Sequence, residues 1–269
     1  MKILAFTDFH GDKKIISKIL KKIKNEGPDV LVCTGDFTVF GKNLENIMSN
    51  FLISKPFVFI PGNHEDNEKS LYVFAKKPEA LLVHQTAIVV KGVLFVGSGG
   101  GIYGKTEPTL EISKKHLSLK IKNFKKSHPK GKVVFLTHRP AHGTKCDFMT
   151  DIKEHVGATN ITDFIKKNPI DLHICGHIHE CFNTRDKIGK TITTNPGTTP
   201  NLNASTIFFF SEVSEISIFG LNFILKFSES ISFGITQYSF KRKIFGNILL
   251  KMSSEIFNSE ITLFFKIPF

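Results

Sequence analysis

The 269-residue sequence predicts an α/β fold. Short apolar runs rich in β-branched residues alternate with stretches of helical periodicity. Five of these runs are followed directly by acidic, amide or histidine side chains. The five runs are residues 3–6, 30–33, 57–60, 133–136 and 172–175. Parallel strands joined by helical crossovers would bring all five ends to one edge of a sheet.

The elements before residue 100 follow this alternation. Residues 13–25 place isoleucine and leucine on one stripe with lysine opposite, which indicates an amphipathic helix that ends at Gly27-Pro28. Two apolar segments separated by Lys91-Gly92 are typical of a β-hairpin. Further helices are expected at residues 43–53 and 67–76, and the hairpin strands at residues 87–90 and 93–96.

The elements after residue 100 end in a segment of different composition. We expect helices at residues 107–127 and 160–167, a strand at residues 191–194, and a loop through Asp147. The last 69 residues hold 13 of the 27 phenylalanines and no histidine, aspartate or cysteine. Residues 208–210 suit one more strand. We therefore predict one α/β domain at residues 1–210 and an unassigned Phe-rich extension at residues 211–269.

Composition bounds the class of protein. The 41% hydrophobic and 22% charged residues are ordinary for a globular domain. We see no signal peptide at the start of the sequence and no uninterrupted apolar stretch that would span a bilayer, so we expect no membrane partner. Four cysteines without C-x-x-C or zinc-knuckle spacing suggest small core residues in a reducing compartment, so a cytoplasmic location is expected.

The formal net charge of +12 favours partners that carry phosphate. The lysines are spread over predicted helices, as in Lys13-Lys14 and Lys125-Lys126, and solvated helix faces account for most of the charge. A nucleic-acid groove stays open as an alternative. The oligomeric state is not indicated by any feature of the sequence.

The side chains after the first two strands are suited to metal binding. Asp8 and His10 stand two residues apart, where an extended turn points both side chains toward one cation. Asp36 follows Gly35, and its two carboxylate oxygens can bridge two cations. The five strand ends together hold enough ligands for two divalent cations, and two-metal sites suit displacement at phosphorus.

The remaining strand ends add amide and imidazole groups. Asn63 follows Pro61-Gly62 and offers a neutral oxygen, which leaves His64 beside the metals without necessarily binding one. His138 follows the fourth strand. His177 and His179 flank Ile178, so they can serve one metal or one each on two neighbouring metals.

The segments D-x-H, G-D, G-N-H-E, T-H and G-H-x-H, in this order, resemble the calcineurin-like metallophosphoesterase family over residues 1–200. The resemblance implies a two-sheet β-sandwich flanked by helices. It also implies that Asp8, His10 and His179 bind a first metal, that Asn63, His138 and His177 bind a second, and that Asp36 bridges them. His64 would then be the general acid or stabilise the pentacoordinate phosphorus.

The implied reaction is hydrolysis of a small-molecule phosphate ester, a monoester or a diester, by a metal-bridging hydroxide. The mixed nitrogen and oxygen ligands suit Mn, Fe, Zn, Co or Ni better than Mg. After Asp36 the sequence reads F-T-V-F-G, which departs from the G-D-x-V-D-R-G of the Ser/Thr protein phosphatases. Two alternatives remain: a nuclease acting on DNA or RNA, and a non-catalytic scaffold that binds proteins.

Residues outside these roles are less constrained. Arg139 suits either a phosphate contact or a place at the surface, and His142 and Asp147 are expected near the substrate rim. The other histidines are expected to be structural or solvated. They are His84, His116, His128, His155 and His173.

Overall fold

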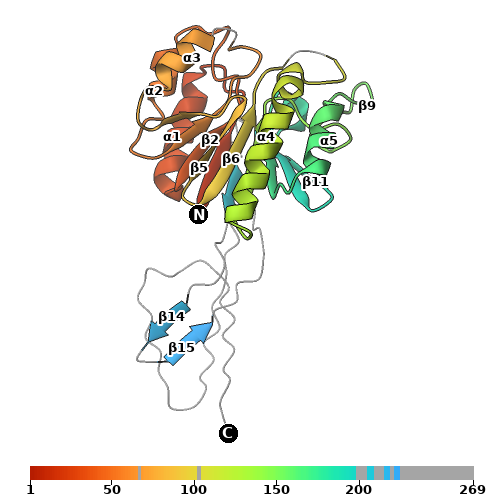
Figure 1. Cartoon of the computed structure of the whole chain (residues 1–269). Helices are drawn as coiled ribbons and strands as arrows, with labels where there is room; N and C mark the ends of the chain where they lie inside the picture. Colours follow the sequence, from red (N-terminus) through yellow and green to blue (C-terminus); the bar gives the residue numbers. More distant parts are fainter. Residues whose placement is uncertain (66–67, 102–103, 198–204, 209–214, 219–220, 225–269) are drawn as a thin grey trace, which may run out of the picture. The chain divides into compact units, whose positions relative to one another are not determined.

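The computed structural model describes residues 1–65, 68–101, 104–197, 205–208, 215–218 and 221–224. The chain divides into one compact unit of residues 1–207 and another of residues 208–269. In the first unit, strands and helices alternate along the chain (Figure 1).

The first sheet holds five strands in the order β13-β1-β2-β3-β4. Neighbouring strands from β1 to β4 pair in parallel. The strands are β1 (Lys2–Phe6), β2 (Val30–Cys33), β3 (Phe57–Phe59), β4 (Ala80–Leu82) and β13 (Ser205–Phe208). The helices in this part of the chain are α1 (Lys13–Glu26), α2 (Leu44–Ser49) and α3 (Glu68–Phe74).

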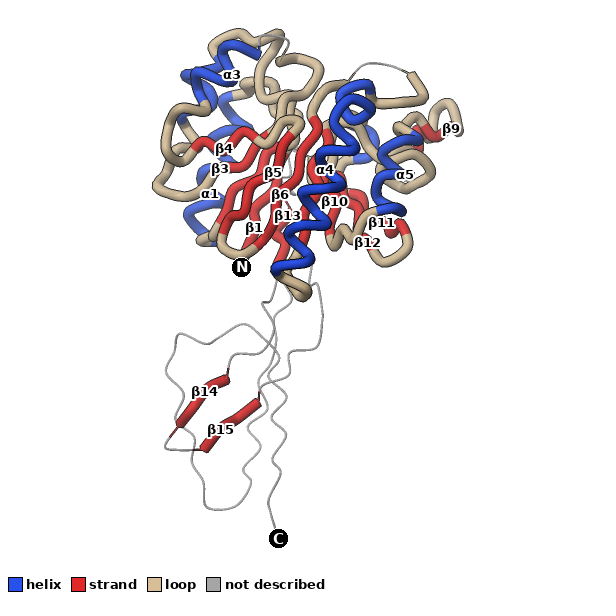
Figure 2. The backbone as a smooth tube through the Cα atoms, viewed as in Figure 1, coloured by secondary structure: helices blue, strands red, loops and turns tan. Residues whose placement is uncertain are grey.

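The second sheet holds six strands in the order β11-β12-β10-β7-β6-β5. Its four inner strands are parallel, and the two edge strands pair antiparallel with their neighbours. The strands are β5 (Thr86–Val90), β6 (Val93–Ser98), β7 (Val133–Thr137), β10 (Leu172–Ile174), β11 (Thr184–Ile188) and β12 (Thr191–Asn195). Helices α4 (Pro108–Ser127) and α5 (Thr159–Lys167) accompany this sheet (Figure 2).

Both faces of the first sheet are covered. Leu4 and Phe6 of β1 belong to one apolar cluster with Ile19 of α1. Ile3 and Ala5 point to the opposite face, because successive side chains of a strand alternate, and they are also fully buried. The predicted α/β sandwich of two sheets flanked by helices is therefore confirmed. The expectation of one shared sheet edge needs correction, because β1, β2 and β3 belong to one sheet and β7 and β10 to the other.

Several elements differ from the prediction. Helix α2 ends at Ser49 rather than at residue 53, because the Asn50 side chain donates to the carbonyl groups of Asn46 and Ile47 at 2.8 and 3.0 Å. The segment after Asp147, for which no element was predicted before helix α5, contains a small hairpin. Strand β11 was not predicted, since its sequence, T-R-D-K-I, is that of a polar edge strand. Short strand β4 was also missed, and the small hairpin consists of β8 (Phe148–Met149) and β9 (Glu154–His155).

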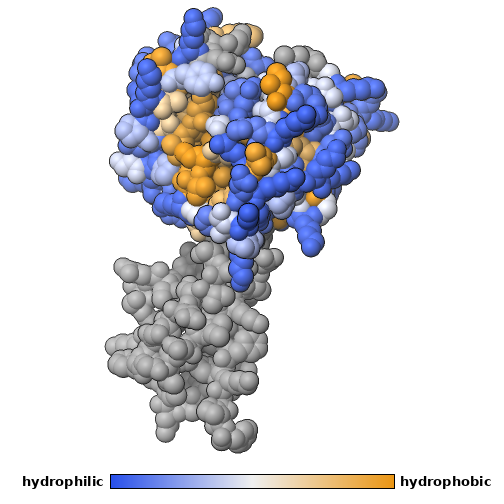
Figure 3. Space-filling model, viewed as in Figure 1, coloured by the Kyte–Doolittle hydropathy of each residue, from blue (hydrophilic) through white to orange (hydrophobic). Residues whose placement is uncertain are grey.

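In the second unit, β14 (Glu215–Ile218) pairs antiparallel with β15 (Leu221–Ile224). Most of the predicted extension, residues 211–269, lies outside the described residues, and its boundary at residue 210 stays a prediction. Of the strand suggested at residues 208–210, only Phe208 is described, at the end of β13. None of the helices that the structure describes is long and apolar enough to cross a membrane. Figure 3 shows a largely hydrophilic face with an apolar area over β5, where Val89 is exposed.

Candidate metal centre

The ends of five parallel strands bring all seven predicted ligand residues together. Asp8 and His10 follow β1, Asp36 follows β2 and Asn63 comes after β3. The second sheet contributes the three others. His138 follows β7, His177 follows β10, and His179 begins the short 3₁₀ helix η1 (His179–Cys181).

The loops at these strand ends are tightly folded. Four of the seven residues adopt a left-handed backbone: Asp8 (φ 52°), His10 (φ 45°), Asp36 (φ 50°) and His177 (φ 70°). Residues other than glycine rarely adopt this conformation, and it concentrates at functional sites. Glycine is required at Gly62, where a Cβ atom would clash with Oδ1 of Asp36.

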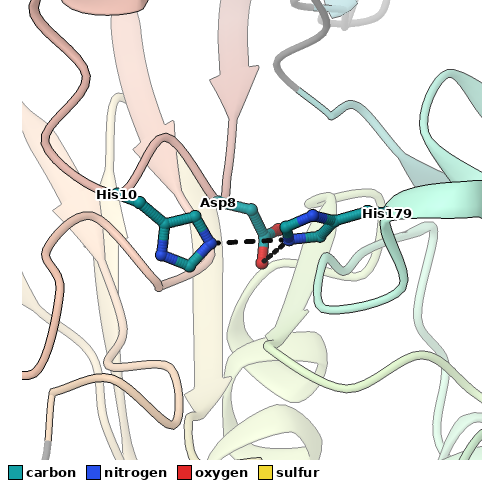
Figure 4. A group of neighbouring side chains, drawn as sticks. All are labelled: Asp8, His10 and His179. Atoms are coloured by element: carbon teal, nitrogen blue, oxygen red, sulfur yellow. Dashed lines mark hydrogen bonds and ion pairs between the residues drawn. The ribbon is translucent and has the colours of Figure 1, made fainter.

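Asp8, His10 and His179 form a cluster that we call the outer triad (Figure 4). The Nε2 atoms of His10 and His179 lie 3.4 Å apart, and His179 Nε2 lies 3.6 Å from Asp8 Oδ1. The His179 side chain is 53% exposed. Because Asp8 contacts His179, the pKa of that imidazole is raised, whereas burial lowers the pKa of His10.

Asp36, His138 and His177 form a second cluster, the inner triad. His138 Nε2 lies 3.4 Å from Asp36 Oδ2 and 3.2 Å from His177 Nδ1. Asn63 Oδ1 lies 3.0 Å from the same His138 nitrogen. The His138 side chain is fully buried, so this triad is withdrawn from solvent, unlike the outer one.

Charge coupling dominates the inner triad. Burial lowers the pKa of His138, but the carboxylates of Asp36 and Asp8 outweigh it and raise that pKa to about 9. Burial raises the pKa of Asp36, yet the contacts with His138 and the hydrogen bonds from His138 and His64 bring it below its usual range. Burial and the nearby His138 charge lower the pKa of His177 to about 4. The lowered pKa keeps the Asp36 carboxylate in its charged form, as metal binding requires.

Hydrogen bonds at Nδ1, the ring nitrogen that faces away from the triads, orient His138 and His10. His138 Nδ1 lies 2.8 Å from the carbonyl oxygen of Thr34, and His10 Nδ1 lies 3.3 Å from that of Thr38. A ring nitrogen that donates to a carbonyl leaves the other nitrogen with its lone pair free for a metal. In both residues that other nitrogen is Nε2, the atom that faces the triads. The donor set therefore fits divalent cations that accept mixed nitrogen and oxygen ligands.

His64 lies between the triads. Its backbone N–H donates to Asp36 Oδ1 at 2.9 Å, and its Nε2 lies 3.9 Å from Asp36 Oδ2. Its ring meets the His10 ring edge-on at 4.7 Å between centroids. The sequence predicts His64 beside the metals, and the structure places it next to two of the predicted ligand residues, Asp36 and His10. His64 also forms a possible ligand group with His10 and Asp36, so its role as an acid rather than a ligand stays a prediction.

Glu65 organises the site, a role that sequence reasoning missed. Its buried carboxylate accepts hydrogen bonds from the backbone N–H groups of Asp36 (2.8 Å), Thr38 (3.0 Å) and Gly62 (2.9 Å). Burial and the nearby Asp36 charge raise the pKa of Glu65 to about 7. The position was visible as the last letter of G-N-H-E, but two of its partners, Asp36 and Thr38, lie on the loop that follows β2.

Two residues near His138 depart from expectation. Arg139 is only 3% exposed, and its guanidinium donates to the carbonyl groups of Gly104, Thr106 and Val156, so a place at the surface is wrong. Asp147 is fully buried and does not line a rim. It accepts hydrogen bonds from the N–H groups of Gly143, Thr144 and Gly157 and so holds its own loop together.

The cysteines are buried, and the other histidines either pack within the fold or, like His116 and His128, are exposed to solvent. All four cysteines are free and buried. His173 is fully buried between the hydroxyl groups of Thr137 (2.8 Å) and Thr193 (2.7 Å). His155 Nδ1 contacts Asp147 at 2.8 Å, and His84 Nδ1 accepts from the N–H of Gly99 at 3.1 Å.

Comparison with known families identifies the family to which the chain belongs. Residues 1–181 match the model of the calcineurin-like phosphoesterases. The chain belongs to this family. As a calcineurin-like phosphoesterase it is a metal-dependent hydrolase of phosphate esters, and the non-catalytic alternative is not supported.

Two curated relatives extend over much of the phosphoesterase. An uncharacterized protein of Methanocaldococcus jannaschii, MJ1162, is 31% identical over 207 residues, which are 73% of this chain and 88% of the relative. A probable glycerophosphodiester phosphodiesterase, GpdQ, of Arcobacter nitrofigilis is 27% identical over 163 residues, 58% of this chain and 59% of the relative.

Solved structures share the fold of this phosphoesterase. The protein TT1561 of Thermus thermophilus has a TM-score of 0.57 at 17% identity, covering 77% of this chain and 93% of the other. A dimetal phosphatase from Danio rerio has a TM-score of 0.54 at 12% identity, with 79% and 94% coverage. At these identities the likeness speaks for the fold alone.

Proposed function

We propose that the protein hydrolyses phosphate esters with two divalent cations, one held by the outer triad and one by the inner triad with Asn63. Asp36 would bridge the two. Mn, Fe, Zn, Co and Ni suit the mixed ligands. Such cations would neutralise charge that develops on the phosphoryl oxygens and lower the pKa of a water nucleophile.

The position of Asp36 is the observation that carries this proposal. Its carboxylate contributes to a possible metal group with His138 and His177, and to another with His10 and His64. Its Oδ2 lies 3.4 Å from His138 Nε2 on one side and 3.9 Å from His64 Nε2 on the other. A carboxylate that lies within reach of both groups of ligands can bridge two cations.

His64 would hold the proton that the departing ester oxygen needs. Its Nε2 faces Asp36, at the edge of both triads, while seven other residues are available to fill the metal coordination. General acid catalysis by a positioned imidazole accelerates such a step by roughly 10²–10⁴-fold.

The test combines metal analysis with hydrolysis. Protein purified without chelator and reconstituted with each divalent metal should bind about two ions per chain. It should hydrolyse bis-p-nitrophenyl phosphate or p-nitrophenyl phosphate, and the ratio of the two rates gives the preference between diester and monoester. Fewer than one ion per chain under metal-replete conditions would contradict the two-metal site.

The nuclease alternative stays a prediction that rests on the +12 net charge. Binding of single- or double-stranded nucleic acid should then weaken steeply with salt, because phosphate contacts release counterions. Cleavage of nitrophenyl esters together with salt-independent, weak nucleic-acid binding would favour a small-molecule substrate.

A further inference from the structure

A tight turn beside the metal centre holds an unusual residue. The carbonyl of Val39 accepts from the N–H of Lys42 at 3.2 Å, and the two central residues, Phe40 (φ 49°) and Gly41 (φ 70°), are both left-handed. This is the pattern of a type I′ turn, which favours asparagine, aspartate or glycine at both central positions. A bulky aromatic residue with positive φ is a rare outlier that points to a functional constraint.

The Phe40 side chain does not compensate for this conformation by burial, since the residue is 65% exposed. Instead its ring stacks on that of His64, with 4.4 Å between centroids and 24° between planes. The neighbouring Val39 is also exposed, at 41%. The turn therefore presents an apolar surface next to the imidazole that faces Asp36.

Packing, rather than a hydrogen bond, orients the His64 ring in the described part of the chain. Its Nδ1 is buried and has no hydrogen-bond partner there. The ring lies between the edge-on ring of His10 and the stacked ring of Phe40. Phe40 thus touches the group that meets the departing ester oxygen in the proposed function.

We propose that Phe40 is a specificity-determining residue whose exposed ring contacts the departing group of the substrate and favours phosphate esters of aromatic alcohols. This rests on the proposed function, because a ring stacked on the proton donor lies on the side from which the alcohol leaves. An aromatic departing group packs against such a ring in an offset or edge-on arrangement, whereas a short alkyl group leaves it in water.

The chain offers a matched control for the strained turn. Lys91 (φ 48°) and Gly92 (φ 80°) occupy the same positions in the turn between β5 and β6. Replacing either Phe40 or Lys91 with glycine relieves the same backbone conformation, but only Phe40 contacts His64.

The experiment compares benzyl and ethyl phosphate esters, whose alcohols are similarly poor leaving groups, on the metal-loaded full chain. Phe40→Gly should melt no lower than the parent and keep its metals. Its kcat/KM for the benzyl ester should fall about three- to tenfold more than for the ethyl ester, mainly through KM. Phe40→Tyr should retain the benzyl preference, and Lys91→Gly should leave both substrates unchanged.

Equal losses for the two esters in Phe40→Gly would overturn the proposal and leave Phe40 as a positioning residue for His64. An unchanged kcat/KM for the benzyl ester in Phe40→Gly would also overturn the proposal. If the parent binds two metals but hydrolyses neither ester nor the nitrophenyl substrates, the proposed function itself fails and takes this inference with it.

Discussion

The outer and inner triads are built from the same residue types but in opposite environments. Each combines one aspartate and two histidines, yet His179 of the outer triad is about half exposed, whereas His138 of the inner triad is fully buried. The buried triad shows strongly shifted pKa values, because burial and unscreened charges act there together. The comparison teaches that the fold buries Asp36 and His138 of the inner triad, whereas His10 and His179 of the outer triad stay accessible to solvent and substrate.

Replacing Asp36 should weaken metal binding at both triads and have the largest effect on activity. Asp36→Asn keeps the shape but removes the charge that both groups share, so binding of both cations should weaken. Loss of several kcal/mol of charge stabilisation corresponds to about 10⁴-fold or more in kcat/KM. Metal analysis and initial rates measure this. A variant with two metals and full activity would show that Asp36 does not bridge.

Changing His64 should spare both triads and reduce only turnover. His64→Ala should keep two metals and lose about 10²–10⁴-fold in kcat for alkyl esters. The loss should be smaller for nitrophenyl esters, because nitrophenolate needs little protonation. Equal losses for both ester types would argue against proton donation, and loss of a metal ion would identify His64 as a ligand.

Replacing one histidine from each triad should sharpen the contrast between them. His179→Ala should lose the outer cation but regain it at high metal concentration, since water can reach the exposed position. His138→Ala should not be rescued in this way, and the metal-free protein should lose about 1–3 kcal/mol of stability, because the buried Asp36 and Asn63 lose a partner. Metal titration and thermal unfolding of both variants check this. Identical rescue of both would remove the distinction.

The remaining prediction concerns pH and His173, a fully buried residue of β10 that belongs to neither triad. Burial lowers the pKa of His173 from an ordinary 6.5 to about 3. Between these values the unfolded chain binds a proton that the folded chain does not. The contribution of His173 to the free energy of unfolding should therefore be fully present above about pH 6.5. It should fall by about 1.4 kcal/mol for each pH unit below that value, down to about pH 3.

The control for this prediction is His173→Gln, which can keep hydrogen bonds to Thr137 and Thr193 but does not titrate. Unfolding measured with chelator present, so that metal release does not contribute, should show a shallower pH dependence in the variant. Parallel curves for parent and variant would mean that His173 is not the group that resists protonation.

The difference between what could and could not be predicted follows the range of the interactions. The amphipathic helix α1 and the hairpin at Lys91-Gly92 were readable because their signals lie within a few residues. The same holds for Asp8 and His10, which are neighbours on one loop. Helix α2 was predicted to be too long, because its C-terminal end depends on hydrogen bonds from the Asn50 side chain. Strand β11 was missed because only its pairing with β12 makes it a strand.

The sequence by itself determined the fold class and the candidate ligands, because strand periodicity and the residues at strand ends are local properties of the chain. Tertiary structure decided everything that depends on residues meeting from distant segments. It put β1 and β7 in different sheets, withdrew His138 from water, and joined Glu65 to the backbone of the loop that follows β2. It also stacked Phe40 on His64, because a turn of two left-handed residues directs that ring toward the site rather than into the core.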